Sequence, residues 1–298
     1  MPARFRRQRL LIVGCGDVGQ RVVRHVGGSQ PRRLRVLALT SSPAKMADLR
    51  MAGVTPLLGN LDDAATLARL AGLAHRVLHL APPPSEGTTD PRTRNLVATL
   101  RRRSLPAALV YGSTSGVYGD CHGAWVSETR PTQGHTPRSI RRVDAESRVR
   151  HLGRATDVRT TVLRIPGIYA LDRANGTPAT RLQKGTPVLL AQDDVYTNHI
   201  HADDLARACI AALWRGQPQR VYNVNDDTQL KMGDYFDLAA DILQLPRPPR
   251  VPRSAAQAQL PSMMLSFMGE SRRLDNSRMK RELRLRLAYP TVAAGLKS

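Results

Sequence analysis

Near the start of the chain, an apolar strand-like run leads directly into a glycine-rich loop and then a helical pattern. The run spans residues 9–13, and the loop reads Gly14-Cys15-Gly16-Asp17-Val18-Gly19. Here Gly14 would allow a sharp turn, Gly16 a close approach to a phosphate, and Gly19 close helix packing. The following helix would offer unpaired N–H groups to an anion. The loop therefore predicts a cradle for a dinucleotide pyrophosphate, with an ordinary glycine-rich turn as the alternative. The predicted contacts are Gly14, Gly16, Asp17, Val18 and Gly19.

Strand-like runs alternate with helical patterns through the first two thirds of the chain. The predicted strands are residues 9–13, 34–39, 54–58, 76–80, 108–112, 158–164 and 221–224. The predicted helices are residues 17–26, 44–51, 62–70, 93–103, 139–151 and 202–214. This alternation favours βαβ units with right-handed crossovers. We therefore expect an α/β fold with a doubly wound parallel sheet of the Rossmann type, which binds its ligand at the carboxyl ends of the strands.

Two stretches interrupt the alternation and suggest a second lobe. Residues 166–194 are rich in Gly, Pro and Thr, and the helical patterns after residue 228 are broken by the proline-rich run 246–252. We expect residues 1–165, completed by 195–228, to form the dinucleotide-binding domain. Residues 166–194 and 229–298 would form a smaller, mostly helical C-terminal lobe that binds the substrate.

Length and composition fit a globular protein with a full core, since the chain has 298 residues of which 41% are apolar. The early apolar run is too short for a signal peptide, and no 18 apolar residues stand together, so we expect a cytoplasmic protein without membrane spans. The three cysteines are widely spaced and lack a Cys-x-x-Cys pair. They indicate reduced thiols rather than a disulfide framework or a zinc site.

The net charge of +21 would ordinarily suggest a polyanionic partner. However, only five of the 45 basic residues are lysines, and the arginines are spread through every segment. This skew is typical of a GC-rich genome, and the 4% of aromatic residues offers little material for base stacking. We therefore expect no nucleic-acid partner, although arginine clusters could attract anionic substrates.

Four stretches resemble the short-chain dehydrogenase/reductase superfamily, in its extended branch of NAD-dependent epimerases and dehydratases. They are the glycine loop, Gly112-Ser113-Thr114-Ser115-Gly116-Val117-Tyr118-Gly119, Leu163-Arg164-Ile165-Pro166-Gly167-Ile168-Tyr169, and Thr197-Asn198-His199-Ile200-His201-Ala202-Asp203-Asp204-Leu205-Ala206. They occur in the family's order within residues 9–224. The resemblance implies a nicotinamide cofactor and a small-molecule substrate, and many relatives are homodimers.

The residues after the second predicted strand bear on the choice of cofactor. A protein that prefers NAD normally places a carboxylate there for the ribose 2′-hydroxyl. Here Thr40, Ser41, Ser42 and Lys45 follow instead. Hydroxyl groups and a cation suit a 2′-phosphate, so we favour NADP over NAD, while a plain helix cap stays an alternative. Asn60 and Leu61 stand where relatives bind the adenine, and we add Ala81 to the cofactor contacts.

The chain departs from the family at the catalytic pair. Active relatives carry Tyr-x-x-x-Lys on one helix, in which the tyrosine supplies the proton. Counting back from Glu146, the tyrosine position falls on Arg138 and the lysine position on Arg142. Arginine stays protonated, so Arg138 cannot act as a general acid, whereas Arg142 can still bind a ribose or a phosphate.

Several side chains are candidates for the missing function. Thr114 matches the residue that binds the substrate oxygen in relatives, unless its hydroxyl only satisfies the backbone. Tyr118 is a weaker catalytic candidate, since a tyrosine here often packs against the sheet. Cys121-His122 suggests a nucleophile and a base, but adjacent residues usually point apart. His199 and His201 suggest helix punctuation rather than a metal site, and we predict no metal.

These observations leave three functions open. The first is an NAD(P)-binding oxidoreductase of the epimerase/dehydratase type, which acts on a small sugar-like or anionic substrate through a non-standard proton donor. The second is a catalytically silent NAD(P)-binding sensor, and the third is a nucleic-acid-binding protein. The candidate catalytic residues are Thr114, Tyr118 and Arg142.

Overall fold

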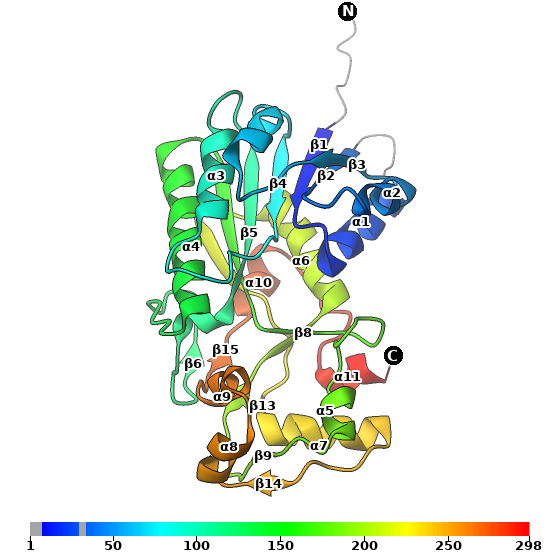
Figure 1. The fold of residues 1–298 in the computed structure, drawn as a ribbon, viewed down its shortest axis with the longest axis vertical. Coiled ribbons are helices and arrows are strands. Elements are labelled where there is room, and N and C mark those ends of the chain that lie inside the picture. Colours follow the sequence, from blue (N-terminus) through cyan, green and yellow to red (C-terminus); the bar gives the residue numbers. More distant parts are fainter. Residues whose placement is uncertain (1–7, 30–33, 298) are drawn as a thin grey trace, which may run out of the picture.

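The computed structural model describes residues 8–29 and 34–297. The first seven residues of the predicted dinucleotide-binding domain, residues 30–33 and residue 298 lie outside this part. Seven parallel strands form one central sheet in the order β12-β7-β5-β4-β1-β2-β3 (Figure 1). Its strands are β1 (Gln8–Val13), β2 (Leu34–Thr40), β3 (Thr55–Leu58), β4 (Arg76–His79), β5 (Ala108–Thr114), β7 (Arg159–Ile165) and β12 (Arg220–Asn223). The predicted parallel sheet is confirmed, and each predicted strand agrees with one of these to within two residues at either end.

Helices cover both faces of the sheet because its strands alternate apolar side chains between the two faces. Leu10 and Ile12 pack with α1 and α6, whereas Leu11 and Val13 pack with α3 and α4. This arrangement is doubly wound, as predicted. The helices of this half are α1 (Asp17–Ser29), α2 (Lys45–Met51), α3 (Pro91–Leu100), α4 (Pro137–Ala155) and α6 (Ala202–Arg215), with 3₁₀ turns η1 (Ala64–Leu70) and η2 (Ser115–Tyr118).

The long helix α4 begins two residues before its predicted start. The hydroxyl of Thr136 accepts a hydrogen bond from the backbone N–H of Ser139 at 3.1 Å, and Pro137 occupies the first turn. A threonine cap followed by proline is a favourable start, because neither position leaves an unpaired N–H. The apolar pattern alone placed the start too late.

A second group of elements lies beyond the carboxyl edge of the sheet, in the lower part of Figure 1. Its core joins side chains of α5, α7, α8, α9 and α11 with those of short strands. The helices are α5 (Ala179–Gln183), α7 (Met232–Leu243), α8 (Arg253–Gln259), α9 (Ser262–Met268) and α11 (Val292–Leu296), whereas α10 (Ser277–Glu282) packs against β12 of the large sheet. The short strands are β6 (Trp125–Val126), β8 (Gly167–Tyr169), β9 (Val188–Leu189), β10 (Tyr196–Thr197), β11 (His199–His201), β13 (Leu230–Lys231), β14 (Arg250–Val251) and β15 (Arg273–Leu274).

One part of the predicted C-terminal lobe returns to the sheet. Strand β15 pairs with β6, and Met279, Leu283 and Leu285 join the core formed by α1, α6 and the sheet. These residues therefore stabilise the nucleotide-binding half rather than the smaller lobe. The division of the chain into two domains otherwise stays a prediction.

Candidate functional site

The glycine loop after β1 has the geometry that its sequence predicts. Gly14 has a φ of +89°, and a Cβ there would lie 2.4 Å from the backbone nitrogen of Ala81. Gly19 packs close to the loop, since its Cβ would lie 3.2 Å from the carbonyl oxygen of Gly14. A Cβ on Gly16 would meet nothing within 4 Å. Packing thus requires glycine at position 14 and leaves little room for a side chain at position 19, while Gly16 leaves open space beside the start of α1.

A cavity of about 240 Å³ lies at the carboxyl edge of the sheet, beside this loop. Its walls come from the glycine loop, the ends of β5 and β7, helix α4 and the segment after β7. The lining residues are Gly14, Gly16, Asp17, Val18, Gly19, Leu80, Gly112, Ser113, Thr114, Arg138, Arg142, Ile165, Pro166, Ile168, Arg173 and Leu205. The structure therefore brings the predicted pyrophosphate cradle together with Thr114 and the two arginines of α4.

A buried ion pair fixes the orientation of α4 over the sheet. The carboxylate of Glu146 accepts hydrogen bonds from Nη2 of Arg164 on β7 at 2.8 Å and from the hydroxyl of Ser113 on β5 at 2.6 Å. Burial would lower the pKa of Arg164, but the hydrogen bond and charge of Glu146, together with Tyr118, outweigh this effect and raise it. Arg142 and Arg138 lie one and two helical turns before Glu146, so they share its face and reach the cavity.

The two arginines differ in how firmly they are held. Arg142 donates from Nη1 to the carbonyl of Gly112 at 2.7 Å and to the hydroxyl of Tyr111 at 3.0 Å. The pKa of Arg138 is lowered by burial and by the adjacent Arg142, against the attraction of Glu270. Both side chains remain cations at any ordinary pH. The cavity thus carries positive charge where it borders α4.

Thr114 lines the cavity, and its hydroxyl also satisfies the backbone, while its contact with a substrate stays a prediction. Its hydroxyl oxygen accepts a hydrogen bond from the N–H of Gly116 at 3.3 Å. Tyr118 is fully buried outside the cavity lining. Its hydroxyl donates to Asn223 at 2.7 Å, and Arg164 lies over its ring. The proposed catalytic role of Tyr118 is therefore corrected: it packs within the protein, because its ring fills the space beside β7.

The residues predicted to bind the adenosine half lie beyond the cavity, at the ends of β2 and β3. The hydroxyl of Thr40 accepts from the N–H of Ser42 at 3.2 Å and donates to its carbonyl at 3.3 Å. Ser41 and Lys45 are exposed. Helix α2 is preceded by Ala44, with no side-chain cap. The alternative interpretation of these hydroxyl groups as a helix cap is therefore wrong, and they remain accessible to a ligand.

The remaining predicted contacts follow β3 and β4. The side-chain oxygen of Asn60 accepts from the N–H of Asp62 at 3.0 Å, and the residue is exposed. Leu61 is buried, and its carbonyl accepts from Asn95. Ala81 supports the turn at Gly14 from behind and does not line the cavity.

Other candidate chemistry is not assembled by the fold. Cys121 is buried, whereas His122 is exposed and pairs with Asp120 at 3.0 Å, so they do not act together. His199 stacks on Tyr235, and His201 accepts from the N–H of Asp203 to cap α6. The first turn of α6 also carries the carboxylates of Asp203 and Asp204, so these residues mark the start of the helix as predicted. Residues 8–29 and 34–297 contain no group of three or more potential metal ligands.

Sequence reasoning missed two charged residues in or near the cavity. Arg173 follows β8 and lines the cavity, and Glu270 lies near the turn after Thr114, with its Oε2 4.0 Å from an ideal Cβ on Gly116. Neither stands in a recognisable motif. The only signal for Arg173 was its place in the segment after β7, the strand that neighbours β5. Within the described residues, no helix is long and apolar enough to cross a membrane.

Together the sheet, the loop and the cavity define a doubly wound α/β protein of the Rossmann type with a second lobe over its carboxyl edge. Residues 10–225 match the model of the NAD dependent epimerase/dehydratase family. Because this match covers most of the chain, the protein belongs to that family. A search of curated proteins finds no match.

Solved structures agree with the assignment over almost the whole chain. A functionally unknown conserved protein from Silicibacter pomeroyi shares 30% identity, with a TM-score of 0.78 and 97% of each chain covered. UDP-glucose 4-epimerase from Thermotoga maritima shares 18% identity, with a TM-score of 0.79 and coverage of 97% and 96%. The dTDP-glucose 4,6-dehydratase of Streptomyces venezuelae, in a structure with NAD bound, shares 21%, with a TM-score of 0.77 and coverage of 97% and 95%. The last two establish the likeness of fold alone.

Proposed function

We propose that this protein is an NAD(P)-binding oxidoreductase of the epimerase/dehydratase type, acting on a small sugar-like or anionic substrate that carries a carbonyl or hydroxyl group. The observation that supports this function is the single cavity lined by Gly14, Gly16, Thr114 and Arg142. It unites a phosphate-binding loop with groups able to bind a polar substrate. The family to which the chain belongs is NAD dependent, which supports a nicotinamide dinucleotide as the cofactor here.

The residues present fit a dinucleotide. The space beside Gly16 is open, and the first turn of α1 presents unpaired N–H groups toward it. When bound, the nicotinamide supplies the acceptor or donor of a hydride. Arg142, which is already anchored to Gly112, would bind the ribose, and Thr114 would bind the substrate oxygen. The cationic Arg138 would favour an anionic substrate.

The cofactor we favour is NADP. Strand β2 ends in Thr40, and Ser41, Ser42 and Lys45 follow, without the carboxylate that would accept from a 2′-hydroxyl. Hydroxyl groups and an ammonium group are donors to a phosphate. A 2′-phosphate would therefore be bound where a 2′-hydroxyl finds no acceptor.

The proton transfer needs a group other than the two arginines, and we assign it to Glu270. Its carboxylate lies outside the cavity lining but close to the turn at Gly116 and within electrostatic reach of Arg138, and Arg272 holds it in place through a 2.8 Å hydrogen bond from Nη1. During oxidation of a hydroxyl group, the hydroxyl proton would pass through a water molecule to Glu270. In the reverse direction, Glu270 would return the proton to the carbonyl oxygen.

The test combines binding with turnover. NADPH and NADH are titrated by fluorescence, and a panel of sugar nucleotides and small carbonyl compounds is screened by the absorbance of reduced nicotinamide. We expect turnover that falls about tenfold in Thr114→Ala, the loss of one hydrogen bond, and persists in Thr114→Ser, which keeps the hydroxyl. Binding without turnover of any substrate would contradict the enzymatic function.

A catalytically silent NAD(P)-binding sensor is the second candidate, favoured by Arg138 and Arg142 at the family's catalytic positions. These residues keep charge for binding but cannot transfer a proton. If the natural chain binds NADPH without turnover, and the double variant Arg138→Tyr/Arg142→Lys gains turnover, the sensor is supported. Turnover by the natural chain would exclude it.

A further inference from the structure

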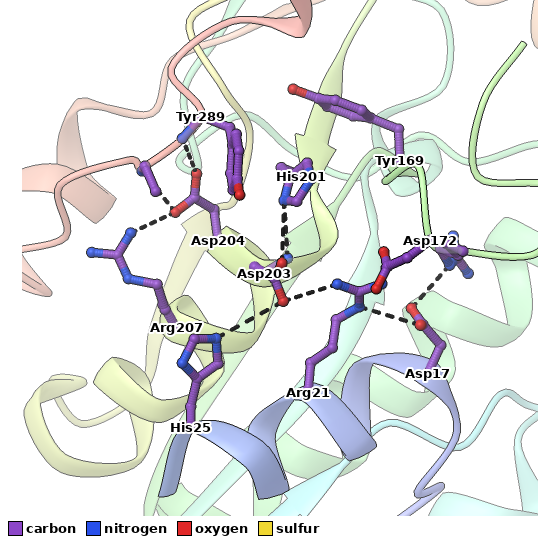
Figure 2. Close-up of polar contacts among 12 residues, drawn as sticks. Asp17, Arg21, His25, Tyr169, Asp172, His201, Asp203, Asp204, Arg207 and Tyr289 are labelled. Carbon is purple, nitrogen blue, oxygen red and sulfur yellow. Dashed lines mark hydrogen bonds and ion pairs between the residues drawn. The ribbon is translucent and has the colours of Figure 1, made fainter. Parts of the chain in front are cut away.

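A buried arginine joins three segments beside the glycine loop. Arg21 on α1 donates from Nε to Asp17 at 3.2 Å and from Nη1 to Asp203 at 2.9 Å, and its Nη2 donates to Asp172. Figure 2 shows its guanidinium group between these carboxylates, which come from α1, from the start of α6 and from the segment after β8. Burial would lower the pKa of Arg21, but the hydrogen bonds to Asp172 and Asp203 outweigh this effect and raise it. Each of the three side-chain nitrogens of Arg21 therefore donates to a carboxylate, and together they hold the segments in place.

Asp17 has a second partner that reaches the cavity. Arg173 donates from Nε to Asp17 at 3.1 Å and from Nη1 to the carbonyl of Ile168 at 3.0 Å. No hydrogen-bond partner for its Nη2 is found among residues 8–29 and 34–297. Because Arg173 lines the cavity together with Gly14 and Gly16, this nitrogen is available to a ligand there.

This cluster carries a net negative charge next to the place where an anionic pyrophosphate would bind. Asp17, Asp172 and Asp203 are three carboxylates, whereas Arg21 and Arg173 are two guanidinium groups. The five side chains thus carry one excess negative charge. Asp17 also lies in the first turn of α1, where the helix would bind a pyrophosphate. An anionic ligand at this point needs a cation to offset Asp17, and Arg173 is the cation in place.

We propose that Arg173 is a phosphate-binding residue for the dinucleotide, and that Asp17 positions it. The inference rests on the proposed function. Arg173 keeps its bonds to Asp17 and Ile168 while its Nη2 donates to the pyrophosphate. The planar guanidinium group allows all three bonds at once, which a lysine ammonium group cannot reproduce in the same geometry. Asp17 then acts through Arg173 rather than on the cofactor itself.

The test measures the Kd of NADPH and of ADP-ribose, which keeps the pyrophosphate but lacks the nicotinamide. Arg173→Ala should raise both Kd values about 10- to 100-fold, the usual loss of affinity for a charge-assisted hydrogen bond. Arg173→Lys should recover only part of the affinity. Arg247→Ala is the matched control, because Arg247 also pairs with an aspartate, Asp241, but on the exposed surface of the smaller lobe. It should change neither Kd.

A second variant separates the electrostatic role of Arg173 from a purely structural one, in which Arg173→Ala would lower the Tm and Asp17→Asn would restore no affinity. In the Arg173→Ala background, Asp17→Asn removes the unbalanced carboxylate and should restore part of the affinity, with little change in Tm. If Arg173→Ala binds both ligands as tightly as the natural chain, the inference is wrong while the proposed function stands. If the natural chain binds neither NADPH nor NADH, both the inference and the proposed function are wrong. If Arg173→Ala does not fold, unchanged affinity in Arg173→Lys overturns the inference.

Discussion

The two ends of the cavity differ in how closely they follow the family pattern. At the β1–α1 end, Gly14 and Gly19 are packed as a dinucleotide cradle requires, and Gly16 leaves the space open. At the α4 end, Arg138 and Arg142 line the cavity at the positions where the sequence predicts the Tyr-x-x-x-Lys pair, on a helix that the buried Glu146 ties to β7. The glycine end therefore presents a backbone suited to a phosphate, whereas the α4 end presents two cationic side chains.

This difference separates the part of the site that would bind the cofactor from the part that would carry out the reaction. Glycines in a cradle are fixed by backbone contact, so few replacements are possible there. Side chains on α4 project into a cavity, so they can change without disturbing the fold. A protein of this family can thus keep its cofactor site while its reaction is altered or lost.

The largest effect is expected at the α4 end, from Glu270→Gln. The amide keeps the size of the side chain but cannot take up the proton, so kcat should fall about a hundredfold or more. Glu282→Gln is the control, since Glu282 pairs with Arg220 away from the cavity. Steady-state kinetics checks the prediction. An unchanged kcat would show that Glu270 takes no part in proton transfer.

The next effect is expected at the glycine end. Gly14→Ala places a Cβ against the backbone of Ala81 at a positive φ, and should lower the free energy of unfolding by roughly 3 kcal/mol or more. Gly16→Ala meets no neighbour, so it should unfold like the natural chain but bind NADPH about tenfold more weakly or worse, a loss of about 1.4 kcal/mol. Denaturant titration and fluorescence binding distinguish the two. Equal stability of both variants would contradict the packing argument.

A smaller effect is expected on how the stability of the protein depends on pH, through two buried histidines. Burial, helped by Arg142, lowers the pKa of His79 to about 3, and burial lowers that of His199 to about 3. A histidine in the unfolded chain titrates near 6.5. Between about 6.5 and 3 the unfolded chain binds more protons, so stability is lost as the pH falls through this window.

His79→Gln removes one of these two contributions. The Tm of the variant should therefore fall less steeply than that of the natural chain between about pH 6.5 and pH 5. The raised pKa of Asp226, about 7, has the opposite slope but is common to both proteins. Scanning calorimetry across this range makes the comparison. Parallel curves would mean that His79 is not held neutral by its surroundings.

The smallest effect is expected on cofactor choice. Lys45 is exposed, and an exposed ion pair contributes little to binding. Lys45→Ala should therefore weaken the binding of NADPH about threefold and leave the binding of NADH unchanged. Lys184→Ala, at another exposed lysine, is the matched control. Equal weakening of both cofactors would place Lys45 away from the 2′-phosphate.

Most of the fold could be predicted because local patterns determine it. The alternation of Leu10, Leu11, Ile12 and Val13 between two helical layers is a direct consequence of strand geometry. The smaller lobe was harder, because its strands are two or three residues long and pair across large distances in the sequence. Nothing local indicated that Met279 would return to the core of the sheet.

The site could be predicted only where backbone or helical spacing specified it. The glycine loop and the positions of Arg138 and Arg142 relative to Glu146 follow from spacing alone. Tyr118 was misplaced because a motif does not show which way a side chain points. Arg173, which lines the cavity, and Glu270, which lies close to Gly116, were missed because only tertiary packing brings their segments to this part of the fold.

Titration of NADPH into the natural chain and into Gly16→Ala tests the central claim most directly, that the cavity at the glycine loop binds a dinucleotide. We predict saturable binding by the natural chain and a Kd at least about tenfold higher for the variant, at equal Tm. Absence of binding by the natural chain, or equal affinity of the two proteins, would contradict the account.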